Sequence, residues 1–200
     1  MYVVNLIIEM EKLIGVVLCG GKSSRMGRDK GLILMNGKPW AMICAEKLQE
    51  LGLRVLVSIN DSQKEEYSKY FPLNALVMDN WTESGPIGGI LTVHKQFQTS
   101  DLLVLACDLV DMDISTLRVL VNKYTTKPYF HFYAFHNGRF WEPLCCIYTG
   151  RVLQGIPVLA RSLQDVLGSG NALKIPVQNA GCFKNYNRLD LCSNNFQINI

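Results

Sequence analysis

A glycine-rich loop with basic side chains follows an apolar run near the start of the sequence, and its residue types suit phosphate chemistry. The run at 13–18 is followed by Gly20 and Gly21, and the loop continues through Arg25 to Lys30. Glycines let backbone N–H groups approach an anion closely, and Arg and Lys supply the full charges that a transferring phosphoryl group requires. The segment therefore indicates a polyphosphate site. The alternative is a basic loop that binds no ligand.

The spacing of this loop excludes two common nucleotide-binding motifs. A Walker A loop has four residues between its first glycine and the Gly-Lys-Ser/Thr that ends it. Here five residues separate Gly21 from Gly27, and Arg28 and Asp29 come next. The dinucleotide fingerprint Gly-x-Gly-x-x-Gly does not fit an adjacent glycine pair. The loop is thus neither a P-loop nor a dinucleotide site.

The elements that must position this loop alternate between apolar runs and helix-like stretches. Four runs with little polar alternation, at 14–18, 55–59, 75–78 and 102–106, predict parallel strands buried on both faces. Helices are expected at 39–51, at 86–97 and, with Asp113 as N-cap, up to about residue 124. This order predicts an α/β fold: a three-layer, Rossmann-like sandwich with a mostly parallel central sheet. Ligands of such a fold bind at the carboxyl ends of the strands.

The segment 129–148 follows a different pattern. Two aromatic, β-prone runs, 129–135 and 141–148, flank Asn137 and Gly138, which is a strong hairpin signal. We expect a small antiparallel hairpin here, as an insertion or an edge ribbon. No linker or repeat is visible, so the sequence predicts a single domain over 1–200, with 1–12 as a short N-terminal extension.

Bulk composition excludes several classes of protein. A net charge of +3, spread along the chain outside the loop, argues against nucleic-acid binding. The seven cysteines are odd in number and include no C-x-x-C pair, which predicts free thiols in a reducing compartment. The apolar start lacks the features of an export signal, and no run approaches the ~20 apolar residues of a membrane span. We expect a cytoplasmic protein without membrane or nucleic-acid partners.

The segment Leu-Cys-Gly-Gly-Lys-Ser-Ser-Arg-Met-Gly-Arg-Asp-Lys at 18–30 resembles the signature of the MobA-like nucleotidyltransferases, most specifically the molybdenum cofactor guanylyltransferases. Four further segments resemble family motifs in the same order, and together they cover nearly the whole chain. They are Asp79 with 85–90, the Ala-Cys-Asp at 106–108, the Glu-Pro-Leu at 142–144 and the Asn-Tyr-Asn at 185–187.

The resemblance implies a Mg²⁺-dependent enzyme that transfers GMP from GTP to the phosphate of molybdopterin and releases pyrophosphate, in molybdenum cofactor biosynthesis. Its partners would be GTP, a molybdopterin-type cofactor and, transiently, other cofactor-biosynthesis or acceptor proteins. Alternatives are a nucleotidyltransferase of the same fold that uses CTP with the pterin or a sugar phosphate, and a catalytically silent nucleotide-binding relative. The charges of Arg25, Lys30 and Asp108 argue against the silent relative.

Three of these residues are the candidate catalytic groups. Asp108 follows a buried strand and is the candidate Mg²⁺ ligand, since Mg²⁺ usually takes one or two carboxylates with water and phosphate oxygens; the alternative is a loop or capping Asp. Lys30, a compact charge, is expected at the α-phosphate. Arg25 is expected to hold the β- and γ-phosphates in a bidentate contact.

The remaining candidates bind the nucleotide. A carboxylate can accept from both guanine N1–H and N2–H, and Asp79 is placed to offer one. By resemblance, Asn60 also contacts the nucleotide, although an ordinary turn and N-cap explains it equally well. By resemblance to related nucleotidyltransferases, one of Asn185 and Asn187 completes the metal or α-phosphate shell opposite Asp108. The alternative is that Asn187 caps a last short helix. The resemblance assigns the other nucleotide contacts to Leu18, Cys19, Gly20, Gly21, Gly85 and Gly88.

Overall fold

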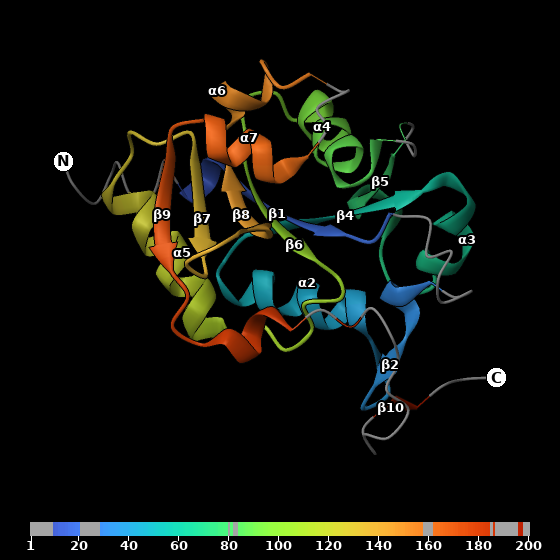
Figure 1. Ribbon diagram of the computed structural model, residues 1–200. Helices are drawn as coiled ribbons and strands as arrows, with labels where there is room; N and C mark the ends of the chain where they lie inside the picture. The colour runs from blue at the N-terminus through green and yellow to red at the C-terminus, as the bar shows by residue number, and fades with distance from the viewer. Residues whose placement is uncertain are drawn as a thin grey trace.

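The computed structural model describes residues 10–20, 29–79, 81, 84–157, 162–184, 186 and 196–197. In this part of the chain one seven-stranded sheet has the order β5-β4-β1-β6-β8-β7-β9 (Figure 1). Its strands are β1 (Leu13–Leu18), β4 (Arg54–Asn60), β5 (Leu76–Asp79), β6 (Asp101–Ala106), β7 (Phe132–His136), β8 (Trp141–Tyr148) and β9 (Ala172–Pro176).

The sheet is mostly parallel, which confirms the predicted fold class. Strands β5, β4, β1 and β6 pair in parallel, and their bounds agree with the four predicted runs to within one or two residues. Strand β8 runs antiparallel to both β6 and β7, which confirms the predicted hairpin. Of its two expected positions, an insertion or an edge ribbon, the edge ribbon is wrong, because β8 hydrogen-bonds to β6 and β9 covers the far side of β7.

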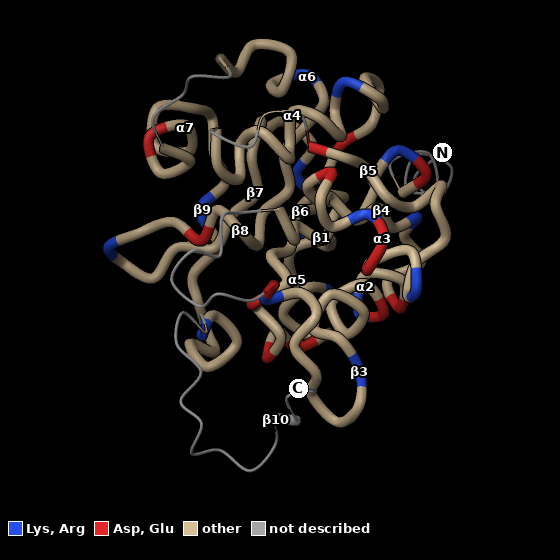
Figure 2. The backbone as a smooth tube through the Cα atoms, turned by 90° about the vertical axis from the view of Figure 1, so that its right-hand side faces the viewer, with Lys and Arg blue, Asp and Glu red and all other residues tan. Residues whose placement is uncertain are grey.

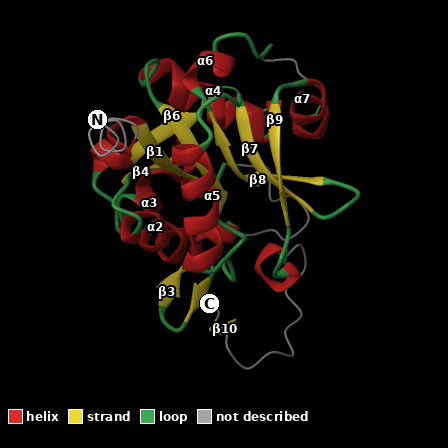
Figure 3. Cartoon of the chain, turned by 90° about the vertical axis from the view of Figure 1, so that its left-hand side faces the viewer, coloured by secondary structure: helices red, strands yellow, loops and turns green. Residues whose placement is uncertain are grey.

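Helices cover both faces of the sheet and make the three layers (Figures 1 and 3). Helices α2 and α5 lie on one face, and α4, α6 and α7 lie on the other. The helices are α2 (Trp40–Glu50), α3 (Lys64–Tyr67), α4 (Pro86–Gln96), α5 (Ile114–Thr126), α6 (Gly150–Leu153) and α7 (Leu163–Ser169). Asp113 is the N-cap of α5 as predicted, and its carboxylate accepts from the backbone N–H of Thr116 at 2.6 Å.

Strand β1 explains why the first predicted run has no polar alternation. All six of its residues are buried. Leu13 and Val17 belong to the core beneath α2 and α5, whereas Ile14 and Val16 belong to the core beneath α4, α6 and α7. Successive side chains of a strand point to opposite faces, so a strand covered on both faces must be apolar throughout.

Short elements complete the described chain. Strands β2 (Leu34–Met35), β3 (Lys38–Pro39) and β10 (Phe196–Gln197) form a small antiparallel sheet. The 3-10 helices are η1 (Lys30–Leu32), η2 (Asp61–Gln63), η3 (Leu73–Ala75) and η5 (Ala180–Phe183). No helix among the described residues is long and apolar enough to cross a bilayer.

The charges and thiols agree with the sequence analysis. In the view of Figure 2, basic and acidic positions are interspersed along the described trace. The six cysteines that the structure describes are buried and free, as expected. Cys192 lies outside the described residues.

Candidate active site

The carboxyl ends of three neighbouring strands bring the candidate nucleotide-binding residues to one level. In the register of β4 and β5, Asn60 is the partner of Asp79. In the register of β1 and β4, Leu18 is the partner of Ser58, which places Gly20 opposite Asn60 two residues later. The approach is close, since a Cβ added to Gly20 would lie 3.3 Å from Asn60 Oδ1. Asp79, Asn60 and Gly20 therefore form a row along this edge of the sheet.

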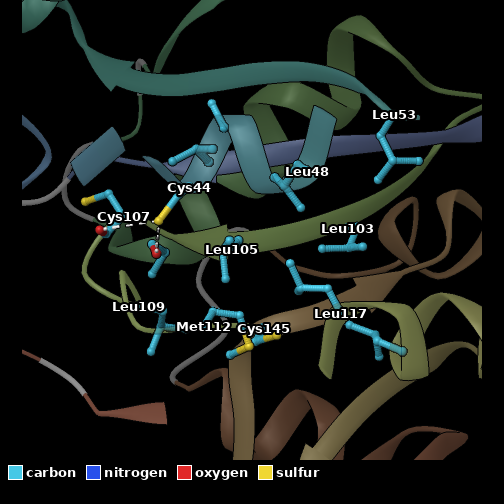
Figure 4. Packing of buried hydrophobic residues seen from close by; sticks show 14 of the residues in the cluster. Cys44, Leu48, Leu53, Leu103, Leu105, Cys107, Leu109, Met112, Leu117 and Cys145 are labelled. Carbon is cyan, nitrogen blue, oxygen red and sulfur yellow. Dashed lines mark hydrogen bonds between the residues drawn. The ribbon is translucent and has the colours of Figure 1, made fainter. Parts of the chain in front are cut away.

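Strand β6 adds Asp108 to the same row. Leu18 of β1 pairs with Ala106 of β6, so Asp108, two residues after Ala106, reaches the level of Gly20. The exit of β6 is fixed, because the Cys44 thiol of α2 donates to the carbonyls of Ala106 and Cys107 at 3.7 and 3.6 Å (Figure 4). Residues at or just after the ends of β1, β4, β5 and β6 thus line the edge of the sheet at which a Rossmann-like fold binds its ligand.

A partly buried ion pair lies at the end of this row. Lys30, the first residue of η1, places its ammonium Nζ 2.9 Å from Asp108 Oδ2. The side chains of Lys30 and Asp108 are 19% and 10% exposed. This contact joins the end of the glycine-rich segment to the candidate metal ligand, 78 residues further along the chain. Both residues are candidates from the sequence, and the structure brings them together.

The second oxygen of Asp108 is suited to a cation. Asp108 Oδ1 is buried and accepts no hydrogen bond from the described residues. A buried carboxylate oxygen without a partner is costly, and a divalent cation with hard oxygen ligands compensates it well. The described residues contain no cluster of three or more His, Cys, Asp or Glu that could hold a metal ion. Within this described part of the chain, a metal at Asp108 would be held by one carboxylate together with water and phosphate oxygens, as Mg²⁺ commonly is.

Asp79 is a buried acceptor beside α4. Its Oδ1 accepts from the backbone N–H of Trp81 at 2.8 Å and from Thr92 Oγ1 at 3.1 Å. Gly88 of α4 is needed here for close approach, since an added Cβ would lie 2.6 Å from the Trp81 carbonyl and 3.1 Å from Asp79 Oδ2. Gly85 is the N-cap residue of the same helix. Two donors already occupy Oδ1, so only Oδ2 of Asp79 is available for a base.

Asn60 has the geometry of the turn alternative. Its side chain and that of Gln63 form a capping box, in which Gln63 Oε1 accepts from the Asn60 backbone N–H at 2.6 Å. At the start of the glycine-rich segment, the N–H groups of Cys19 and Gly20 both donate to the Ser58 carbonyl, at 2.9 and 3.1 Å. A nucleotide contact by the Asn60 side chain stays a prediction.

Some of the expected site residues lie outside the described part of the chain. They are Gly21, Arg25, Asn185 and Asn187. Tyr186 is described, and its hydroxyl donates to Asp111 Oδ2 at 2.6 Å in the loop that follows Asp108. That hydrogen bond raises the pKa of Tyr186 to about 12.

Glu142 is a half-buried acidic residue near the start of β8. Strand β8 is antiparallel to β6, with Cys145 paired to Leu105. The regular pairing with β6 ends at that pair, and the register between β7 and β8 shifts beyond it, where His136 pairs with Trp141. Burial raises the pKa of Glu142, and Asn137 Nδ2 donates to its Oε1 at 3.1 Å. Glu142 therefore lies in the hairpin, beyond the part of β8 that pairs with β6.

Comparison with known proteins identifies the family. The family model described as the MobA-like NTP transferase domain matches residues 15–173. The chain belongs to this family. It is therefore a nucleotidyltransferase, and the match spans the whole row of strand ends from Gly20 to Asp108.

Relatives and solved structures agree with this family. A probable molybdenum cofactor guanylyltransferase of Flavobacterium johnsoniae is 30% identical over 155 residues, covering 78% of this chain and 76% of the relative. A molybdenum cofactor guanylyltransferase of Pseudomonas entomophila is 31% identical over 187 residues, covering 87% and 90%. Molybdopterin-guanine dinucleotide biosynthesis protein A from Archaeoglobus fulgidus shares the fold, with a TM-score of 0.69 at 24% identity over 88% of this chain and 93% of that one.

The structure also reveals residues that the sequence analysis missed. Gln63 and Tyr67, from η2 and α3, both hydrogen-bond to Asp29, the residue before Lys30. Neither belongs to the motifs discussed above, and both are more than 30 residues from Asp29. The one signal in the sequence was the polar turn after the second strand, in which only Asn60 was a candidate site residue.

Proposed function

We propose that this nucleotidyltransferase transfers GMP from GTP to the phosphate of molybdopterin, with Mg²⁺, and releases pyrophosphate. The observation that carries the proposal is the Lys30–Asp108 pair, at 2.9 Å, with a buried Asp108 oxygen that accepts from none of the described residues. A positive group and a hard anionic ligand side by side suit a phosphorus centre that gains charge during transfer. The guanylyltransferase names of two relatives that match at 30% and 31% identity support GTP and the pterin acceptor.

In the proposed reaction a phosphate oxygen of the acceptor attacks the α-phosphorus of GTP. The bond from that phosphorus to the oxygen bridging the α- and β-phosphates breaks, and pyrophosphate leaves. No protein nucleophile is needed. Lys30 stabilises charge on the α-phosphate, and Arg25 holds the leaving phosphates. Asp108 would hold Mg²⁺, which neutralises phosphate charge when bound.

Pyrophosphate release from each of the four NTPs, measured alone, with molybdopterin and with a sugar phosphate, tests this function. We expect release only with Mg²⁺, GTP and molybdopterin together. Release with CTP and the pterin would reassign the nucleotide, and release only with a sugar phosphate would reassign the acceptor. No release under any condition, from folded protein, would favour a silent nucleotide-binding relative.

Asp79→Asn should reduce the preference for GTP over ATP without weakening the hold on the triphosphate. The Asn oxygen can still accept from Trp81 and Thr92, but a donor replaces the acceptor Oδ2, which we assign to a guanine N–H. A hydrogen bond to a charged group of this kind is worth roughly 1.5–3 kcal/mol, so the ratio of GTP to ATP affinity should fall by about 10- to 100-fold.

Calorimetric titration of each Mg·NTP measures this effect. Thr92→Val is the matched control, because it removes one donor from Asp79 and leaves Oδ2 unchanged. Equal affinity of the wild type for GTP and ATP, or an unchanged ratio in Asp79→Asn, would remove Asp79 from base recognition.

A further inference from the structure

The side chain of Gln63 connects both ends of the glycine-rich segment. Its Nε2 donates to Asp29 Oδ2 at 2.5 Å and to the Cys19 carbonyl at 3.3 Å. Its Oε1 accepts from the Asn60 backbone N–H at 2.6 Å. One amide therefore links the ends of β1 and β4 to the residue immediately before Lys30.

Tyr67 holds the other oxygen of the same carboxylate. Its side chain is fully buried, and its hydroxyl donates to Asp29 Oδ1 at 2.9 Å. The backbone N–H of Gly31 donates to the same oxygen at 2.9 Å. A Cβ added to Gly31 would lie 2.1 Å from the Tyr67 hydroxyl, so only glycine permits this packing. Contacts to Asp29 and Gly31 thus fix the backbone on both sides of Lys30.

We call Asp29, Gln63 and Tyr67 the Asp29 network. Placing the Asp29 carboxylate in this half-buried position has a desolvation cost. Burial raises the pKa of Asp29, because the charged form is poorly solvated there, and the three donors oppose this effect. An apolar residue of similar size could fill the same space without this desolvation cost. A carboxylate that accepts from three directions, however, fixes the chain more closely than an apolar contact does.

What this network fixes is the position of the Lys30 ammonium. Lys30 lies between the two anchored residues and meets Asp108 at 2.9 Å. Groups that act on a transition state lose effect steeply with misplacement, and an error of about 1 Å can cost roughly 100-fold in rate.

We propose that Gln63 and Tyr67 are positioning residues of the transfer reaction, which act through Asp29 to hold Lys30 beside Asp108. This inference rests on the proposed function, because it assigns Lys30 to the α-phosphate. Gln63 and Tyr67 touch neither the nucleotide nor the acceptor in this assignment.

A polarity swap tests the contact between Gln63 and Asp29. Gln63→Glu alone places two carboxylates face to face, and Asp29→Asn alone places two amide groups face to face. Each single variant should lower kcat by about 10- to 100-fold, with KM for GTP within about 3-fold of the wild type. In the double variant the new amide at position 29 can donate to the new carboxylate at position 63, and kcat should rise by about 5- to 10-fold over the single variants. Recovery should stay incomplete, because a carboxylate at position 63 cannot donate to the Cys19 carbonyl as the Gln63 amide does.

Tyr67→Phe tests the second contact. It removes only the hydroxyl and should lower kcat by about 10-fold with little change in KM. Tyr70→Phe is the matched control, because Tyr70 is 40% exposed and belongs to the same segment. A general loss of folding would lower Tm and would not be repaired by the swap.

Crystal structures of the variants supply a readout that does not depend on activity. The Lys30 Nζ to Asp108 Oδ2 distance should exceed its 2.9 Å in the single variants and return in the double variant. An inactive wild type would refute the proposed function, and the distances would still decide whether the network positions Lys30. An unchanged distance with wild-type kcat in all single variants would overturn the inference.

Discussion

Asp108→Ala should reduce pyrophosphate release from GTP and Mg²⁺ by about 10³-fold while the protein stays folded. The proposed metal would lose its one carboxylate ligand among the described residues, and charge stabilisation by preorganised groups is commonly worth that much. The fold should tolerate the change, because Asp108 Oδ1 is a buried oxygen that no described residue compensates. Removal of such a group relieves a desolvation cost and partly offsets the loss of the contact with Lys30.

Steady-state release assays over a range of Mg²⁺ concentrations, with a thermal melt of each variant, measure this effect. Asp108→Asn preserves shape and an acceptor for Lys30 but not the charge, so it should be nearly as inactive as the alanine variant. Asp165→Asn, an exposed acid on α7, is the control for removal of one negative charge. Full activity of folded Asp108→Ala at ordinary Mg²⁺ would refute the metal assignment.

Lys30→Ala should lower kcat by about 10²- to 10³-fold and change KM for GTP far less. A charge directed at the α-phosphate interacts most strongly when that phosphate passes through its transition state, so its loss affects the chemical step more than ground-state binding. Lys30→Arg should restore only part of the rate, because a planar fork cannot replace a compact ammonium beside Asp108. Arg25→Ala should differ by raising KM as well, since Arg25 is assigned to the leaving phosphates in the ground state.

Initial-rate kinetics with varied GTP separate these effects. Lys38→Ala removes an exposed lysine that pairs with Glu46, and it should leave both constants unchanged. A KM effect for Lys30 with a pure kcat effect for Arg25 would mean that the two roles are exchanged. Wild-type kinetics for both variants would exclude the glycine-rich segment as the triphosphate site.

The parallel half of the fold could be predicted because burial on both faces leaves a clear pattern. Runs such as 102–106 are apolar without interruption, and each is followed by a polar or glycine-rich turn. The position of Asp108 at a strand end followed directly from that pattern. Its contact with Lys30 could not be predicted in this way. The two residues are 78 positions apart, and their contact depends on β1 and β6 being neighbours in the sheet, which no local pattern shows.

The second half of the sheet was harder to predict from the sequence. Strand β9 is five residues long, contains Lys174 and ends in Pro176, so it has no apolar run to recognise. The hairpin was visible from Asn137 and Gly138, but nothing local shows that β8 pairs with β6. The Asp29 network was invisible for a similar reason, since Asp29 is more than 30 residues from Gln63 and Tyr67 and only the tertiary fold brings them together.

The place of β1 between β4 and β6 also bears on how the enzyme folds. A nascent chain that ends before residue 101 contains the glycine-rich segment and the strands β4 and β5, but β1 still has an open edge. Leu13 of β1 pairs with Asp101 of β6, which is 88 residues later in the chain. Such long-range pairing forms slowly, because the entropy of loop closure is lost before the stabilising contacts between the strands are made. Until β6 has been synthesised and has paired with β1, one edge of the apolar strand β1 is exposed to other chains. We therefore expect the time between synthesis of β1 and β6 to be the interval in which this chain is most prone to aggregate.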